Sequence, residues 1–410
     1  MAEWKFRRRP LLLRSRRIRM AKVAKERSNG SANLSFYIHV PYCVKRCGYC
    51  DFNTYTPGEL NSSNLIQITT TYIDSALGEI EQAAKKLGNS QVETIFFGGG
   101  TPSLLPAEEV GRVITRISNL FDLDPNAEIT LEANPDTVTK PFLDSIRKLG
   151  VNRISMGMQS AVPHVLKALD RTHNPENVVT SCELAKGAGF EHLSVDLIYG
   201  VPGESIDDWK TSFDAAMELP INHISAYALI VEAGTKLAAQ IKRGELTMPH
   251  EDETAEKYLL FDAAATRKGF DWYELSNWAK PGAESLHNKA YWNGNSWWGV
   301  GPGAHSFVNG RRWWNVKHPV KYQELIQQNK SPEQDSEVLT MENIKDEFVM
   351  LRIRTRDGIQ LDKLTDKQLE VANQFKNSGH IESSTWSDSR LVLTATGRLI
   401  ADRIVRELLV

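Results

Sequence analysis

At 410 residues, the chain is long enough for two to three domains, or for one α/β barrel of about 200–250 residues with a smaller companion. Hydrophobic residues make up 41% of the sequence and charged residues 24%, and this ordinary usage excludes collagen-like and wholly disordered proteins. No stretch approaches the roughly 18 uncharged apolar residues of a membrane-spanning helix, so no such span is expected.

The first thirty residues form a basic arm. They contain eleven lysines and arginines but two glutamates, a charge of +9, so the net charge of −2 leaves −11 on the other 380 residues. Residues 1–33 are expected to be a disordered tail; sequence upstream of a second start at Met20, or an Arg-rich transit peptide, are the alternatives. The arm lacks the apolar core of a secretory signal, which favours a reducing, cytoplasmic location. The acidic remainder argues against nucleic acid as a partner.

Three of the four cysteines lie within eight residues, directly after the predicted strand Ser35–Val40. A disulfide between two of Cys43, Cys47 and Cys50 would leave the third unpaired, and structural zinc takes four ligands, usually in two distant pairs. Thiolates are the soft ligands of iron–sulfur clusters, and a cubane held by three of them leaves one iron open. We therefore predict a 4Fe-4S cluster on these cysteines. Cys182 falls in an amphipathic helical run and is predicted to be a small core residue.

Short β-rich runs alternate with longer helical runs up to about residue 230, the pattern of βα units around a parallel sheet. The predicted strands are Ser35–Val40, Glu93–Phe97, Glu128–Glu132, Arg153–Met156, His192–Ile198 and His223–Leu229. The predicted helices are 65–86, 107–119, 138–148, 164–188 with an interruption at Pro175, and 206–217. Six such units predict an α/β fold with an incomplete (βα)6 barrel over residues 34–240, whose site lies at the carboxyl ends of the strands.

Beyond residue 240 the alternation changes. Residues 251–267 are predicted as a helix, and seven of the ten tryptophans lie between Trp272 and Trp314, so residues 241–335 form an aromatic-rich extension. Residues 336–410 are predicted to form a small winged-helix-like domain. Its expected elements are a helix from Met341, a loop at Arg356–Gly358, a helix over 366–376, a hairpin-like Gly379–Leu393 and a helix over 395–408.

The CxxxCxxC spacing resembles that of the radical S-adenosylmethionine superfamily, whose members hold the amino and carboxylate groups of adenosylmethionine on the open iron. Within that superfamily the chain is similar to the coproporphyrinogen-dehydrogenase-like branch, from about Phe36 to the C-terminus. The matching strings are Phe36–Cys43, Gly98–Ser103, Glu132–Pro135, Gly157–Gln159 and Asp196–Pro202. All of them fall at or just after the ends of predicted strands, where βα barrels build their sites.

The resemblance implies a set of adenosylmethionine contacts on these strings. Glycines at a strand end let the backbone approach a ligand, and a carboxylate such as Glu132 accepts hydrogen bonds from an ammonium or from ribose hydroxyls. A charge at the end of an apolar strand, as at Asp196, is costly without a partner. The implied contacts are Tyr37, Tyr49, Gly99, Gly100, Thr101, Glu132, Gln159, Arg171, Asp196 and Ala228. The alternatives are a core aromatic for Tyr37, a solvated loop residue for Glu132 and a surface ion pair for Arg171.

One position separates two groups of this branch. Coproporphyrinogen dehydrogenases carry a fourth cysteine two residues after the third, giving CxxxCxxCxC, whereas this chain has Phe52 there. An aromatic residue at that position resembles the heme chaperone HemW family. The string His287-Asn-Lys-Ala-Tyr-Trp292 is similar to a second mark of that family, His-Asn-x-x-Tyr-Trp. The resemblance thus implies a heme chaperone and argues against decarboxylase activity.

The aromatic-rich extension is predicted to hold heme. Flat aromatic side chains supply stacking area, a neutral imidazole is a common iron ligand, and arginines pair with propionates. His287 is the first expected axial ligand and His305 the second, with Arg311 and Arg312 as propionate partners. The alternative is that the tryptophans belong to the core and the histidines are structural. His39, beside the cluster, is expected to pack rather than to bind metal.

These observations favour a heme chaperone in which a 4Fe-4S cluster and adenosylmethionine are regulatory or redox elements. Heme is the expected cargo and an apo-hemoprotein the recipient; an electron donor and a peripheral membrane contact are further expected partners. The rival is a radical enzyme that decarboxylates coproporphyrinogen III, and Phe52 is its chief obstacle. A third class, an RNA-modifying radical enzyme, is disfavoured by the acidic remainder and by the lack of a single-strand stacking signature.

Overall fold

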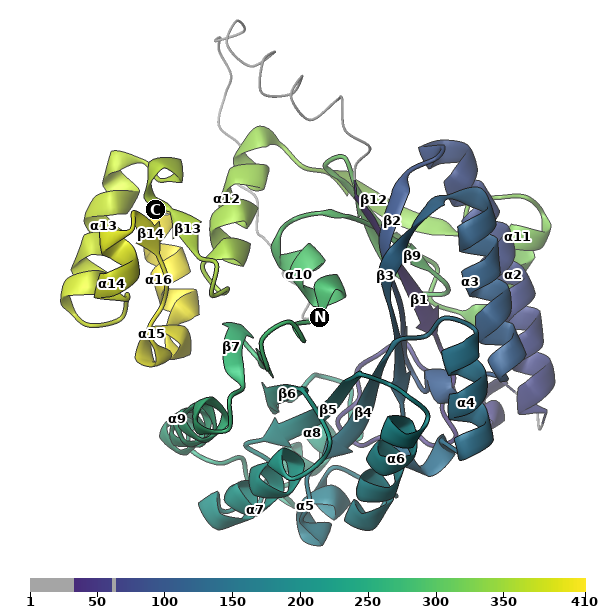
Figure 1. The fold of residues 1–410 in the computed structure, drawn as a ribbon, viewed down its shortest axis with the longest axis horizontal. Coiled ribbons are helices and arrows are strands. Elements are labelled where there is room, and N and C mark those ends of the chain that lie inside the picture. The colour runs from purple at the N-terminus through teal and green to yellow at the C-terminus, as the bar shows by residue number, and fades with distance from the viewer. Residues whose placement is uncertain (1–32, 61–63) are drawn as a thin grey trace, which may run out of the picture. The chain divides into compact units, whose positions relative to one another are not determined.

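The computed structural model describes residues 33–60 and 64–410, and the basic arm lies outside these ranges except for Asn33. Six parallel strands pair side by side in chain order, as β1 (Leu34–Val40), β2 (Gln91–Gly99), β3 (Asp122–Ala133), β4 (Arg153–Gln159), β5 (His192–Tyr199) and β6 (His223–Ala228). The helices between them are α2 (Leu65–Leu87), α3 (Ala107–Leu120), α4 (Lys140–Lys148), α5 (Pro163–Ala168), α6 (Pro175–Gly187) and α7 (Ile206–Met217). The predicted βα alternation is confirmed (Figure 1).

The predicted helix over 164–188 is two helices. Pro175 occupies the first turn of α6, where its missing N–H costs nothing, and the Asn174 side chain accepts a hydrogen bond from Asn177 N. The interruption expected at this proline is therefore a full break with a new N-terminal cap.

Shorter strands extend the sheet at both edges. At one edge, β9 (Ser296–Val300) pairs in parallel with β1, and β10 (His305–Val308), β11 (Arg311–Asn315) and β12 (Glu333–Val338) follow antiparallel. At the other edge, β8 (Asn277–Ala279) pairs antiparallel with β6, and β7 (Asp271–Glu274) lies outside it. The twelve-stranded sheet runs from β12 to β7 without closing, which confirms the prediction of an incomplete barrel. The helices of this region are α8 (Lys236–Lys242), α9 (Glu251–Arg267), α10 (Leu286–Trp292) and α11 (Pro319–Gln327).

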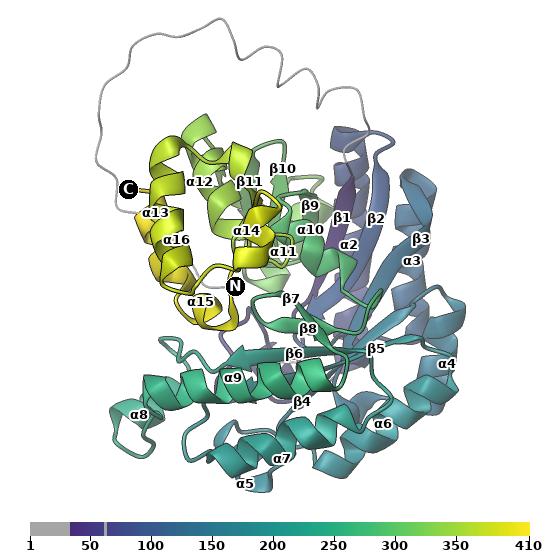
Figure 2. The ribbon, with the colours of Figure 1, turned by 60° about the vertical axis from the view of Figure 1, so that its left-hand side comes forward.

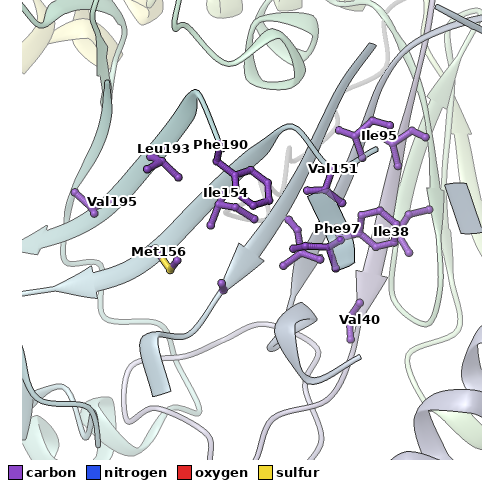
Figure 3. Packing of buried hydrophobic residues seen from close by; sticks show 14 of the residues in the cluster. Ile38, Val40, Ile95, Phe97, Val151, Ile154, Met156, Phe190, Leu193 and Val195 are labelled. Carbon is purple, nitrogen blue, oxygen red and sulfur yellow. The ribbon is translucent and has the colours of Figure 1, made fainter. Parts of the chain in front are cut away.

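The two faces of the parallel strands differ in polarity. Side chains of one face pack beneath the surrounding helices as the main apolar core (Figure 3). Those labelled on four of the strands are Ile38, Val40, Ile95, Phe97, Ile154, Met156, Leu193 and Val195. The alternate residues point to the opposite side, which we call the inner face. They include Tyr37, His39, Thr94, Glu128, Glu132, Arg153, Ser155, Ser194, Asp196 and His223. Polar and ionisable groups thus line the inside of the open barrel.

A buried carboxylate ties α2 to the extension. Glu79 is 1% exposed, and its Oε2 accepts hydrogen bonds from Gly301 N at 2.8 Å and from the Tyr322 hydroxyl at 2.6 Å. Its Oε1 accepts one from Asn315 Nδ2 at 2.8 Å. These three donors lie after β9, at the end of β11 and on α11. Burial raises the pKa of Glu79 to about 7, although the hydrogen bonds oppose the shift.

We expect Glu79 to make the fold less stable as the pH rises from about 4.5 to 7. The folded state keeps a proton on Glu79 that the unfolded chain releases near pH 4.5. The stabilising contribution of Glu79 is therefore full below pH 4.5 and is lost as the pH passes through 7. Glu79→Gln cannot titrate. Denaturant unfolding of both proteins is measured at pH 5, 6, 7 and 8. The unfolding free energy of the wild type should fall relative to that of Glu79→Gln as the pH rises to 7. A difference that stays constant across the four pH values would contradict the prediction.

The C-terminal part, yellow in Figure 2, has an apolar core of its own. This core includes Ile353, Ile359, Phe375, Leu391 and Ile404. Its elements are α12 (Met341–Arg352), β13 (Ile359–Gln360), α13 (Asp366–Asn377), α14 (Ser383–Ser387), β14 (Arg390–Leu391), α15 (Ala395–Leu399) and α16 (Ala401–Leu408).

The structure differs from two predictions for this part in detail. The hairpin over Gly379–Leu393 is interrupted by α14, and β14 pairs with β13 rather than within a hairpin, which leaves a single bridge between Ile381 and Leu393. The last helix breaks at Ile400 into α15 and α16. Among the described residues, no helix combines the length and apolarity needed to cross a membrane.

Candidate functional site

The cysteine loop leaves the carboxyl end of β1 and is fixed along its length by backbone hydrogen bonds. Cys43 N donates to the carbonyl oxygen of Tyr55 at 3.1 Å, which joins the two ends of the loop. In the middle, Gly48 N donates to the carbonyl oxygen of Leu169 at 3.2 Å, just after α5. The loop is therefore held against the carboxyl ends of the strands, as the sequence predicts.

The three thiols of this loop have distinct surroundings. Thr101 Oγ1 donates to Cys43 Sγ at 3.6 Å, and Arg171 Nη1 donates to Cys47 Sγ at 3.4 Å. Burial raises the pKa of the Cys50 thiol to about 11. In residues 33–60 and 64–410, no three His, Cys, Asp or Glu side chains converge on one metal-ion position. A cubane does not require convergence, because each thiolate binds a different iron, so this soft donor set with a nearby guanidinium fits a three-cysteine cluster.

The glycine series at the end of β2 lies against β1. A Cβ at Gly99, whose φ is +109°, would come within 2.6 Å of His39 Nδ1, and a Cβ at Gly100 would come within 2.5 Å of the Tyr42 carbonyl oxygen. Gly100 N and Thr101 N instead donate to backbone carbonyls of β1 and the cysteine loop. The close approach of this chain's own backbone therefore already requires glycine here, whatever ligand contacts the series makes.

Two carboxylates lie on the inner face, on strands separated by β4. Glu132 is the penultimate residue of β3 and its Oε2 accepts a hydrogen bond from Gly99 N at 3.2 Å, while Asp196 on β5 accepts from Ser155 Oγ at 3.2 Å. Burial, followed by the negative charge of Asp196, raises the pKa of Glu132 to about 8, and burial also raises the pKa of Asp196. A cation placed between the two groups would relieve this repulsion, so the pair suits a positively charged ligand.

Arg171 reaches the same region from the segment after α5. Its Nη2 donates to the Gly157 carbonyl oxygen at 3.0 Å, in addition to the bond with Cys47. Gln159 ends β4 with φ +64°, a left-handed conformation that is costly for a residue with a side chain. The structure therefore brings Arg171, Gln159, Glu132 and Asp196 together beside the cysteine loop.

The Radical SAM superfamily model matches residues 37–216, which contain these groups. Over 373 residues the chain is 44% identical to the protein named Heme chaperone HemW of Mycobacterium tuberculosis (strain CDC 1551 / Oshkosh), with 91% of this chain and 94% of that protein covered. The chain belongs to the HemW family. The Heme chaperone HemW of Bacillus subtilis (strain 168) is 32% identical over 383 residues, with 90% and 97% covered.

A solved structure shares the fold. The radical SAM enzyme HemN of Escherichia coli, a coproporphyrinogen III oxidase, superposes with a TM-score of 0.78 over 92% of this chain and 90% of that one. At 21% identity this likeness concerns the fold alone. The open sheet of the HemW-family chain is thus the architecture of a radical SAM enzyme.

The remaining predicted cofactor contacts of this HemW-family chain lie at the edges of the site. The Tyr37 hydroxyl is 3.2 Å from His39 Nδ1, and the Tyr37 ring lies over Phe96 with centroids 6.1 Å apart. Tyr49 packs on a small apolar cluster beside the ends of β5 and β6. Ala228 is the exposed last residue of β6. His39 also contacts the Asn53 carbonyl oxygen at 2.9 Å, which agrees with the packing role expected for it.

His287 of the family string has both ring nitrogens in hydrogen bonds. Its Nδ1 is 2.7 Å from Thr94 Oγ1 and its Nε2 is 2.9 Å from the Tyr291 hydroxyl, while the ring stacks on Phe96 at 4.9 Å. The residue is 1% exposed, and burial lowers its pKa to about 3, so the ring is neutral. The expected axial ligand therefore has no open nitrogen here, and its geometry is that of a structural histidine that joins α10 to β2.

The aromatic extension divides into core and accessible residues. Four of its seven tryptophans are buried, namely Trp272, Trp278, Trp298 and Trp313. The two arginines expected at heme propionates already have partners, Arg311 with Glu333 and Arg312 with both Glu337 and Glu347. Much of the predicted heme seat is thus interior packing, as the alternative interpretation held.

Sequence reasoning missed the anchoring of α10. Glu128 on β3 accepts hydrogen bonds from the first residues of α10, and Arg153 on β4 lies 3.6 Å from that carboxylate. Alternation of apolar and polar residues in both predicted strands places these charges on the inner face, so the period-2 pattern was the available signal. The sequence of these strands does not indicate that Glu128 binds the start of α10, a helix far along the chain.

Proposed function

We propose that this chain is a heme chaperone, which binds heme and transfers it to an apo-hemoprotein. The observation that carries the proposal is its 44% identity to the Heme chaperone HemW of M. tuberculosis over 91% of the chain. Phe52 supports it, because this side chain stands where the rival enzymes have a fourth cysteine, is 52% exposed, and offers no ligand to a cluster or substrate.

In this proposal Cys43, Cys47 and Cys50 hold a 4Fe-4S cluster that supplies electron transfer and, at its open iron, a place for adenosylmethionine. Arg171 offsets thiolate charge at Cys47, where the contact is 3.4 Å. The carboxylates beside it accept hydrogen bonds from the methionyl ammonium and the ribose hydroxyls. The further partners are an electron donor for the cluster and, through the basic arm, a membrane surface.

We base the assignment of adenosylmethionine contacts on the resemblance to radical S-adenosylmethionine proteins. We assign binding to Tyr37, Tyr49, Gly99, Gly100, Thr101, Glu132, Gln159, Arg171, Asp196 and Ala228. The pKa of Glu132 near 8 supports the assignment, because a cationic ligand would stabilise the ionised form of this carboxyl.

Hemin titration of the anaerobically purified, cluster-loaded protein tests the proposal. We expect a saturable change in the Soret absorbance with about one heme per chain, as for a single site. The same batch is then incubated with coproporphyrinogen III, adenosylmethionine and a reductant, and no decarboxylated product is expected. His287→Ala is included to test the axial ligand. Both ring nitrogens of His287 are in hydrogen bonds, so removing the ring should leave the Soret maximum of the bound hemin unchanged.

The outcomes separate the two functions. Conversion of coproporphyrinogen III to protoporphyrinogen IX without hemin binding would show that the chain is the enzyme despite Phe52. Saturable hemin binding without conversion supports the chaperone. A shift of the Soret maximum in His287→Ala would show that His287 is an axial ligand of the heme iron.

A further inference from the structure

The strand pairing of the extension places one set of side chains on the inner face. Trp297 on β9 stands in register with Ser35 on β1, two residues from Tyr37, and Phe307 on β10 stands opposite Trp297. Residues in register point to the same side of a sheet. Trp297 and Phe307 therefore share the inner face with Tyr37.

The next strand continues the set. His305 on β10 pairs with Trp314 on β11, and Phe307 pairs with Arg312. We call Trp297, His305, Phe307 and Trp314 the aromatic face. All four are partly exposed, whereas their chain neighbours Trp298 and Trp313, which point the other way, are 3% and 5% exposed.

Ring contacts join these side chains into two pairs. The Trp297 and Phe307 rings are 5.2 Å apart and tilted by 37°, and the His305 and Trp314 rings are 5.7 Å apart and tilted by 26°. Tyr291 on α10 touches Trp297 edge to face at 4.9 Å. Through Tyr291 and then His287, which lies 4.8 Å from Tyr291 and 6.4 Å from Tyr37, the Trp297–Phe307 pair is linked to the edge of the proposed adenosylmethionine site.

We propose that the aromatic face is the surface on which this chain holds its tetrapyrrole, with no iron ligand from His287. The inference rests on the proposed function, which supplies the cargo. Three neighbouring strands span about 10 Å, comparable to a porphyrin macrocycle, and flat aromatic rings stack on such a ligand. Arg312 lies 5.5 Å from the Phe307 ring but is already paired with Glu337 and Glu347, so the π surface rather than a propionate contact provides recognition.

The test measures binding of hemin and of metal-free protoporphyrin IX to the cluster-loaded protein. Phe307→Leu with Trp314→Leu keeps both side chains apolar but removes two flat rings and part of their volume, and we expect about tenfold weaker binding of both porphyrins. Trp386→Leu is the matched control, because Trp386 is a partly exposed tryptophan on α14 in the C-terminal core. Its porphyrin binding should match the wild type. Iron content and adenosylmethionine binding should be unchanged in both variants.

A second measurement needs no variant. Hydrogen exchange of the wild type with and without hemin should show slower exchange in residues 296–315 on binding. If the wild type binds hemin but the double variant binds equally well, or if protection appears elsewhere, the aromatic face is not the site and the chaperone function stands. If the wild type does not bind hemin at all, the proposed function fails and the inference fails with it.

Discussion

Replacing Cys43, Cys47 and Cys50 together by alanine should remove the brown visible absorbance of the anaerobically reconstituted protein and reduce its bound iron from four atoms per chain to background. The loss should be complete, because Thr101 and Arg171, the polar neighbours of these thiols, offer an alcohol and a guanidinium that do not replace thiolates on iron. Iron and acid-labile sulfide analysis, together with the visible spectrum, measures the effect.

Cys182→Ala provides the matched control for this experiment. Cys182 is fully buried on α6 within the main core, so its removal should cost a small amount of stability and leave the iron content unchanged. The triple variant should also keep its far-ultraviolet circular dichroism, since the loop is held by backbone bonds such as Cys43 N to Tyr55 O. Four irons per chain in the triple variant would show that the cluster has other ligands.

Glu128→Ala should lower the free energy of unfolding by about 3–5 kcal/mol, the usual cost of breaking a buried ion pair. The Glu128 carboxylate is 8% exposed and accepts hydrogen bonds from Leu286 N at 3.0 Å and His287 N at 2.9 Å. Its removal leaves these donors without a partner and strands the charge of Arg153, which is 2% exposed and 3.6 Å away. Urea unfolding followed by circular dichroism, with both proteins in the same cluster state, measures the change.

The double variant Glu128→Ala with Arg153→Met separates charge from packing. Arg153 Nη1 donates to the Ala283 carbonyl oxygen at 2.9 Å, but its Nη2 has no hydrogen-bond partner among the described residues, so replacing the guanidinium removes a poorly satisfied charge. We expect the double variant to lose less stability than the sum of the two single variants. Additive losses, or a loss below about 1 kcal/mol for Glu128→Ala, would mean that the pair is not a buried anchor for α10.

The parallel core was accessible to sequence reasoning because its signal is local. In β3, Ile129 and Leu131 alternate with Glu128, Thr130 and Glu132, so one face is apolar and the other polar within a single strand. The strands of the extension carried no such pattern. Ser296–Val300 has two adjacent tryptophans, which sequence analysis interpreted as a ligand surface, and only pairing with β1 shows that Trp298 belongs to the core.

Sequence patterns indicated which strand ends carry the candidate site residues, but they could not indicate the orientation of those residues. Glu132, Arg171 and Asp196 do meet beside the cysteine loop, because strands of one parallel sheet end on the same edge. The left-handed backbone of Gln159 and the two hydrogen bonds of the His287 ring depend on neighbours that no short segment contains.

By itself, the sequence determined that three close cysteines follow the first strand of a βα array, that Phe52 replaces a fourth cysteine, and that the chain resembles the HemW family. Ligand spacing, strand alternation and helix signals are short-range properties, so they are visible along the chain. Only the tertiary structure decided which rings of the extension are accessible, which charges anchor α10, and that His287 is engaged on both sides. Each of these depends on contacts between residues far apart in sequence, such as Thr94 with His287 and Glu128 with the start of α10, and burial and hydrogen bonding are set by those contacts.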